Sequence, residues 1–248
     1  RIRGENIEDL IGKISFVQMI WLMIQGKMPE VEEACLMEAA LVASVDHGPQ
    51  ASAISAARMA VSCGNSLNHA LASGVNMLGD VHGGAGEQCL ELMQKVKDLL
   101  DKGGNLEASV AEEISKHLQT QGKFIPGFGH RFHRPEDPRA PRLMELVSKA
   151  EGDKIVSGSF IRIGLEIQRH VSQGNSTGIT MNIDGATAVI FGELGFAPPL
   201  ARGLFCLSRS VGILAHAWEQ KNQGGRNKGP TPPEFLWNYT GKNPLKEE

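Results

Sequence analysis

The sequence predicts an all-α fold. Apolar residues recur at spacings of three and four in each long segment of the chain, which is the pattern of helices with one buried face. No stretch of five or more residues alternates cleanly between apolar and polar side chains, as a half-buried strand would. Gly or Pro follows each helical segment and marks its end.

The first half of the chain predicts closely packed helices. A first helix is expected over residues 7–24, and a second can begin after Pro29 and continue to Val45. Pro49 lies where the first turn of a third helix tolerates proline. Residues 51–78 are rich in Ala, Ser and Met. Because small side chains let helices approach closely, we interpret that stretch as one or two buried core helices.

Past Gly84 the helical segments carry more charge. These segments cover residues 88–102, 106–120, 142–150 and 157–171. Residues 200–218 then restore a strongly apolar helix before a tail rich in Gly and Pro. The change indicates a smaller helical domain, residues 87–196, inserted into a larger helical domain made of residues 1–86 and 197–248. A cleft between two such domains is a favoured ligand site.

The charge of the chain speaks against nucleic acid as a partner. Lys and Arg total 25 and Asp and Glu total 28, which gives a net charge of -3, so no basic surface is expected for a phosphate backbone. The four cysteines lie far apart and form no zinc-ribbon or redox spacing. We expect them to be reduced core thiols of a cytoplasmic protein.

The sequence also predicts no membrane association. Its longest apolar stretches, such as residues 19–24, are much shorter than the roughly 20 residues that a spanning helix needs, and no signal peptide opens the chain. The chain begins at Arg1 inside a helical pattern, so we expect its N-terminus to be trimmed.

Three breaks between helices place a titratable side chain among glycines. They contain His82 within residues 81–86, His130 within residues 126–131, and Asp184 within residues 182–185. Glycine beside a functional side chain lets the backbone approach a ligand and frees N–H groups to donate. A single such histidine is more often an ordinary loop or capping residue, but three such breaks together make a functional site as plausible as that ordinary role.

Arginines follow the second of these breaks. Arg131, Arg134 and Arg139 lie within nine residues, and planar guanidinium groups suit bidentate recognition of carboxylate or phosphate. The alternative is a solvated loop with scattered charge.

Two competing interpretations remain open from the residues alone. His130 and His133 could bind a metal, but Gly and Pro make their segment a loop, and no Glu-x-x-His, HExxH or acidic cluster supports a metal site. The chain could also be a helical protein that binds a ligand or a partner without catalysis. His216, in the apolar helix 200–218, is more simply a core histidine than a substrate contact.

Taken together, the motifs resemble those of the citrate synthase superfamily. Residues 127–139 read Gly-Phe-Gly-His, then Arg134, then Asp-Pro-Arg, which is similar to the family signature. His82 to Ala85 resembles its His-Gly-Gly-Ala loop, Asp46 and His47 its upstream histidine site, and residues 182–185 its catalytic aspartate segment. Residues 207–219 are similar to its late, arginine-bearing helix.

The resemblance implies a role for each matching residue. His130 would take the proton of the substrate hydroxyl, His82 would hydrogen-bond the thioester oxygen, and Asp184 would deliver a proton to carbon. The substrate carboxylates would be bound by His47, Arg139 and Arg209. Coenzyme A would be bound by Pro126, Gly127, Gly129 and Arg134. No metal and no tightly bound cofactor is implied, since coenzyme A enters as part of the substrate.

The activity implied is reversible carbon-carbon cleavage of citryl-CoA, or a close analogue, to oxaloacetate and acetyl-CoA, in a homodimer with its site in the interdomain cleft. Asp184 followed by Gly185 is more similar to the citryl-CoA lyase branch than to ordinary synthases, which usually have an aromatic residue next. The alternative is a citrate or methylcitrate synthase that condenses acetyl-CoA or propionyl-CoA with oxaloacetate, because the same residues can catalyse both directions. Arg226 is displaced from the position of a further synthase arginine, so the expected site leaves it out.

Overall fold

The computed structural model describes residues 1–129, 136–173, 178–228, 234 and 241. This part of the chain forms helices joined by short turns, with three isolated β-bridges and no longer strand pairing. The helices are α1 (Ile7–Leu10), α2 (Phe16–Gln25), α3 (Val31–Ser44), α4 (Ser52–Ser62), α5 (Leu67–Asn76), α6 (Ala85–Asp101), α7 (Leu106–Thr120), α8 (Arg139–Gly152), α9 (Ser159–Ser172), α10 (Ile183–Glu193) and α11 (Pro198–Gln223). The predicted all-α fold is confirmed.

The N-terminal region differs from the prediction. The prediction of a single helix over residues 7–24 is wrong, because α1 ends at Leu10 and α2 begins only at Phe16. Gly12 adopts a φ of +77°, and the side chain of Ser15 accepts a hydrogen bond from the N–H of Gln18 in a capping box that starts α2. An N-cap signal inside an apolar pattern therefore divides it.

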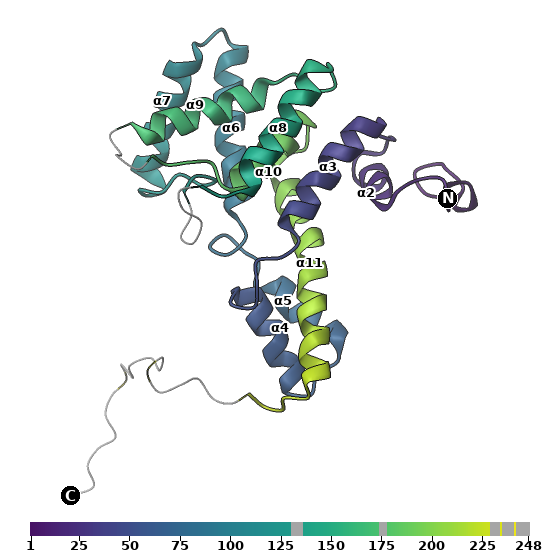
Figure 1. Ribbon diagram of the computed structural model, residues 1–248. Helices are drawn as coiled ribbons and strands as arrows, with labels where there is room; N and C mark the ends of the chain where they lie inside the picture. The colour runs from purple at the N-terminus through teal and green to yellow at the C-terminus, as the bar shows by residue number, and fades with distance from the viewer. Residues whose placement is uncertain (130–135, 174–177, 229–233, 235–240, 242–248) are drawn as a thin grey trace, which may run out of the picture.

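Two hydrophobic clusters meet along α11. The larger cluster contains residues of α2, α3 and α6–α10, together with Leu204 of α11. The smaller cluster joins α4 and α5 to Ile213 and Ala217 of the same helix. Figure 1 shows α11 passing from the main group of helices to α4 and α5 at its far end. One end of α11 therefore packs in the larger cluster and the other end packs in the smaller cluster.

Small residues allow the close packing around α4, α5 and α11, as the sequence predicted. A Cβ on Gly74 of α5 would lie 2.6 Å from a methyl carbon of Ile213 and 2.9 Å from the carbonyl oxygen of Ala53. Residues 51–78 form the two helices α4 and α5. The interpretation of this stretch as buried core helices is wrong for α5, which buries only Ala70 and Gly74. No helix in the described residues is long and apolar enough to cross a membrane. The expectation that all four cysteines are core thiols is wrong, because Cys35 and Cys63 are exposed. The division into domains 1–86 with 197–248, and 87–196, stays a prediction.

Candidate active site

Most of the predicted site residues that the structure describes lie in loops or first helical turns, and Arg209 lies inside a long helix. His47 lies in the connection from α3 to α4, His82 in the turn before α6, Arg139 at the start of α8, Asp184 in the first turn of α10 and Arg209 within α11. Pro126, Gly127 and Gly129 belong to the loop after α7. His130 and Arg134 lie outside the described residues.

Two of the predicted arginines meet at the end of α3. Arg139 donates from Nη1 to the carbonyl oxygen of Ala43 at 3.3 Å, and Arg209 donates from Nε to the carbonyl oxygen of Ser44 at 3.1 Å. The last carbonyls of a helix lack partners within the helix and carry the negative end of its dipole. The end of α3 therefore holds two guanidinium groups close together, as binding of a polycarboxylate requires.

Arg209 is a buried cation with capacity to bind an anion. Only 5% of the residue is exposed, and its guanidinium lies 4.8 Å from the ring centroid of Phe205. Burial lowers the pKa of Arg209, while the charges of Asp46 and Asp184 oppose that shift. Within the described chain its hydrogen bond uses Nε, so its Nη atoms can donate to a ligand carboxylate.

Asp137 fixes Arg139 and links α8 to α10. Its carboxylate accepts hydrogen bonds from Nε of Arg139 at 2.9 Å, from Nη2 at 2.8 Å, and from the backbone N–H of Ile183 at 3.1 Å. Burial of the carboxylate works to raise its pKa, but the hydrogen bonds and charge of Arg139 and the Ile183 N–H lower it to about 2. Asp137 is thus an anion that orients Arg139.

The glycine-rich loop pairs with the segment that precedes α10. The N–H of Asn182 donates to the carbonyl of Gly127 at 3.0 Å, and the N–H of Gly129 donates to the carbonyl of Thr180 at 2.8 Å. Gly127 has a φ of +85°, and a Cβ there would lie 2.5 Å from Sγ of Cys89. Only glycine fits this position without displacing its neighbours.

Asn182 then places Asp184. Its side-chain Oδ1 accepts from the N–H groups of Asp184 at 2.9 Å and Gly185 at 3.3 Å, and its Nδ2 donates to the carbonyl of Gly129 at 2.6 Å. This N-cap satisfies two free donors of α10. One side chain therefore joins the predicted coenzyme A loop to the predicted catalytic carboxyl.

Asp184 has the electrostatic character of a proton carrier. Burial raises its pKa, the charges of Arg209 and Arg139 act against that increase, and the charge of Asp137 adds to it. A carboxyl whose pKa is raised can hold a proton closer to neutral pH than an ordinary aspartic acid can.

His82 is held as a neutral imidazole. Its Nε2 lies 3.3 Å from the N–H of Ala53, which can only donate, so the ring proton belongs on Nδ1. Burial lowers the pKa of His82, and the charge of Arg209 lowers it further. The turn is closed by a hydrogen bond from Gly79 N–H to His82 O at 2.8 Å, and Gly83 adopts a φ of +97°.

His82, Asp184 and Arg139 all lie within electrostatic reach of Arg209. The charge of Arg209 shifts the pKa values of both His82 and Asp184, and the charge of Arg139 acts on both Asp184 and Arg209. The arrangement offers a neutral hydrogen-bond donor and a protonatable carboxyl beside two cations. Acid-base chemistry on a substrate with several carboxylates fits that set.

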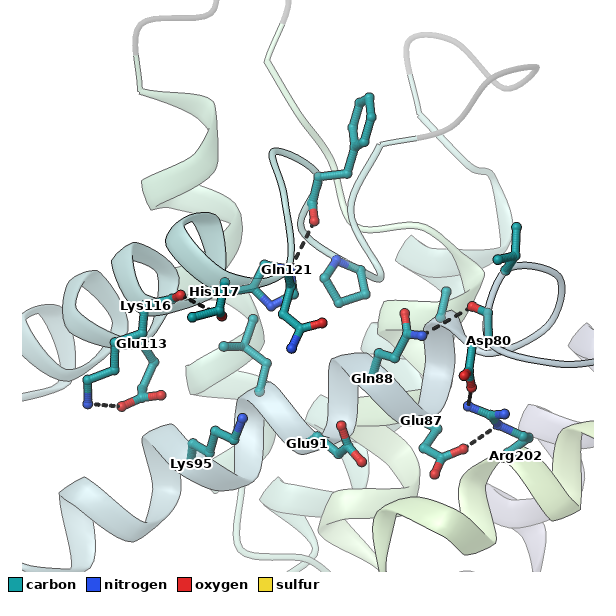
Figure 2. Close-up of a pocket in the computed structure, with 16 residues that line it drawn as sticks. Asp80, Glu87, Gln88, Glu91, Lys95, Glu113, Lys116, His117, Gln121 and Arg202 are labelled. Atoms are coloured by element: carbon teal, nitrogen blue, oxygen red, sulfur yellow. Dashed lines mark hydrogen bonds and ion pairs between the residues drawn. The ribbon is translucent and has the colours of Figure 1, made fainter.

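A groove of about 920 Å³ adjoins this cluster. Figure 2 shows α6 and α7 along its walls. Val81 and Ala85, which flank the His82 turn, line one part, and Pro126 lines another. Among the predicted site residues that the structure describes, Pro126 alone lines the groove, so the groove does not contain the cluster.

An ion-pair group closes one end of this groove. Arg202 of α11 pairs with Asp80 at 2.7 Å and also with Glu87 of α6, as Figure 2 shows. Because Asp80 lies two residues before His82, these contacts tie the His82 turn to α6 and α11.

Asp137, Asn182 and Asp46 lie in the sequence motifs, but the sequence predicted no role for them. All three form hydrogen bonds beside predicted site residues. Their signal was the motif itself, because a short polar residue next to a functional one often holds it in place. In the described part of the chain no group of three or more His, Cys, Asp or Glu side chains could hold a metal ion.

Comparison with known proteins agrees with this geometry. The family model for the citrate synthase C-terminal domain matches residues 29–230. Citrate synthase from Acidithiobacillus ferridurans is 26% identical over 223 residues, which cover 89% of this chain and 54% of that protein. The chain spans about half the length of the curated relatives it matches.

Solved structures are similar over nearly the whole chain. Citryl-CoA lyase from Hydrogenobacter thermophilus has a TM-score of 0.83 and 33% identity, over 98% of this chain and 90% of that one. ATP citrate lyase from Methanothrix soehngenii, solved with citrate and coenzyme A, has a TM-score of 0.80 and 25% identity, over 96% and 39% of the two chains. The chain belongs to the citrate synthase family.

Proposed function

We propose that this protein cleaves citryl-CoA, or a close analogue, reversibly to oxaloacetate and acetyl-CoA. The observation that carries the proposal is the pair of cations, Arg139 and Arg209, held at the end of α3, whose charges act on the carboxyl of Asp184. A carboxyl that can keep its proton, next to groups that bind carboxylates, suits protonation of a carbon on a polycarboxylate thioester.

Cleavage begins with removal of the proton from the tertiary hydroxyl, a step proposed for His130. The bond between the hydroxyl-bearing carbon and the thioester methylene then breaks, which gives the ketone of oxaloacetate and an enolate of acetyl-CoA. Nδ1–H of His82 donates to the enolate oxygen, and Asp184 gives its proton to the methylene carbon to form the methyl group. Condensation uses the same steps in reverse.

The carboxylates of the substrate are proposed to bind His47, Arg139 and Arg209. Asp137 fixes Arg139 by a bidentate pair, so little entropy is lost when this guanidinium meets a ligand. Fixed cations also orient the scissile bond toward the catalytic groups.

Coenzyme A is proposed to enter along the groove between α6 and α7. Pro126 and Val81 line that groove, and the backbone of Gly127 and Gly129 runs beside the N-cap of α10. Arg134 would meet its phosphates. The thioester arrives as part of the substrate, and the mechanism requires no tightly bound cofactor.

Residue 185 supports a lyase over an ordinary synthase. A Cβ on Gly185 would lie 2.4 Å from the carbonyl oxygen of Gly127 and 2.7 Å from Cγ of Met181, so the aromatic residue usual in synthases does not fit after Asp184. The similarity at 33% identity to a citryl-CoA lyase agrees with this assignment.

A second copy of the chain is proposed to cover α11. Leu207, Val211, Leu214 and Trp218 are exposed at spacings of four, three and four, which puts them on one face of the helix. We further propose a cytoplasmic location, in accord with four unpaired cysteines, and closure of a small domain, residues 87–196, over the substrate.

Product analysis tests the function. Synthetic citryl-CoA is supplied, and oxaloacetate, acetyl-CoA, citrate and free coenzyme A are measured together. Oxaloacetate and acetyl-CoA in equal amounts support the lyase. Citrate with free coenzyme A supports a hydrolysing synthase, and recovery of intact citryl-CoA overturns the proposal.

A further inference from the structure

One face of α11 contacts three consecutive residues at the end of α3. Arg209 donates to the carbonyl of Ser44 at 3.1 Å, and His216 Nε2 lies 3.3 Å from Oδ1 and 3.4 Å from Oδ2 of Asp46. Between them, a Cβ on Gly212 would lie 2.4 Å from the carbonyl oxygen of Val45 and 3.0 Å from Asp46 Oδ1. Spacings of three and four put these α11 residues on one face.

The carboxylate of Asp46 can be attracted by two side chains of α11, His216 and Arg209. Its Oδ2 accepts from the N–H of Gly48 at 3.1 Å, and both its oxygens face His216. Its Oδ1 is buried and has no hydrogen bond of good geometry. Burial of Asp46 works to raise its pKa, while Gly48 and His216 lower it. The same carboxylate acts on Arg209 by its charge, so Asp46 and a substrate carboxylate would compete for that cation.

We propose that His216 is a positioning residue for the substrate: by holding Asp46 against Gly48, it keeps this carboxylate off Arg209 and fixes the turn that carries His47. The inference rests on the proposed function, in which Arg209 and His47 bind substrate carboxylates. His216 itself touches no reacting atom.

The other neighbours of His216 keep its ring in place. Nδ1 lies 3.7 Å from Oε2 of Glu219, and Glu219 pairs with Arg58 of α4. Arg58 also donates to Oε1 of Gln223 at 2.8 Å. The ring is therefore oriented from α4 and α11, and its Nε2 is directed to Asp46.

The test measures oxaloacetate binding by isothermal titration, which needs no turnover. His216→Gln keeps a donor near the position of Nε2, whereas His216→Leu and His216→Asn remove it. We expect His216→Leu and His216→Asn to weaken oxaloacetate binding about tenfold, which is within the range of coupling between neighbouring polar groups. The affinity of His216→Gln should stay within about twofold of the unsubstituted protein. In the condensing direction, His216→Leu and His216→Asn should raise KM for oxaloacetate with little change in kcat.

A second substitution tests the competition itself. Asp46→Asn added to His216→Leu removes the competing charge, so binding should return to within about threefold of the unsubstituted protein. His69→Leu, on an exposed face of α5, is the matched control and should bind normally. Thermal melting checks that each variant is folded, and His216→Asn replaces His216→Leu if the latter does not fold.

The outcomes separate the two proposals. Three outcomes each overturn the role of His216. Folded His216→Leu or His216→Asn binds oxaloacetate as tightly as the unsubstituted protein, or kcat falls with unchanged affinity. The third outcome is that Asp46→Asn fails to restore binding. Normal oxaloacetate binding that depends on His216, without citryl-CoA cleavage, overturns the proposed function alone. Absence of oxaloacetate binding by the unsubstituted protein overturns both.

Discussion

The carboxylate of Asp137 and the guanidinium of Arg139 form a two-pronged pair, Nε to Oδ1 at 2.9 Å and Nη2 to Oδ2 at 2.8 Å. Asp137 is only 1% exposed, and it also accepts the N–H of Ile183 at the start of α10. The pair therefore joins two helix N-termini at the candidate site. Its loss should affect both stability and substrate binding.

Asp137→Asn is expected to lower the free energy of unfolding by about 3 kcal/mol at pH 7, because it removes one partner of a buried ion pair. The matched control is Asp101→Asn, which removes an exposed pair with Lys97 and should cost less than about 1 kcal/mol. Urea denaturation of both variants measures the difference. Equal losses would show that the Asp137 pair contributes no more than a surface contact.

The same pair predicts an acid limit to stability. The pKa of Asp137 is about 2 in the folded protein, below its ordinary value of 3.8. Its ionised form therefore adds roughly 2 kcal/mol above pH 4, and this contribution disappears as the pH falls from about 4 toward 2. The difference in stability between the unsubstituted protein and Asp137→Asn should shrink over that window. A constant difference down to pH 2 would contradict this.

His82 should be neutral with its proton on Nδ1. NMR of protein labelled with ¹⁵N-histidine reports the tautomer directly, and a His82→Gln variant assigns the signal. The folded-state pKa lies below the unfolded value near 6.5, so stability and kcat/KM should be kept at neutral pH and decline only as the pH falls below about 6.5. An Nε2–H tautomer, or a pKa above 6.5, would rule out the proposed hydrogen bond from Nδ1.

The sequence predicted the fold better than it predicted how the site is held together. Helical spacing identified most elements, but it missed α10, whose residues from Gly185 to Gly192 are all buried. A helix covered on every side shows no amphipathic period. The glycine neighbours of His82 and Asp184 pointed to both residues. The contact of His216 with Asp46 joins residues 170 positions apart, and no local pattern in a single sequence reports such a distance.

Gly127→Ala should destabilise the protein through two separate effects. Its φ of +85° strains any side chain, and the new Cβ would lie 2.5 Å from Sγ of Cys89 and 2.8 Å from Cα of Gly185. We expect a loss of about 3 kcal/mol. Gly103→Ala is the matched control, because its φ is +89° with nothing within 4 Å, and it should lose about 1 kcal/mol. Similar losses in urea denaturation would mean that the loop moves to admit the methyl group.

Asp184→Asn is the decisive substitution for catalysis. It removes the proton donor while keeping the size of the side chain, so turnover of citryl-CoA should fall at least about a hundredfold. Affinity for the thioester should be nearly unchanged. Asp153→Asn, at the exposed C-terminal end of α8, is the control and should retain full turnover.

Stability should move in the opposite direction from activity. Burial raises the pKa of Asp184, so the folded state binds a proton more readily than the unfolded state, and ionisation at neutral pH opposes folding. A neutral amide removes that cost, so Asp184→Asn should unfold at a higher urea concentration at pH 7 than the unsubstituted protein. A variant that is both inactive and less stable would indicate that Asp184 holds the site together by its charge, and the role of proton donor would then lose its support.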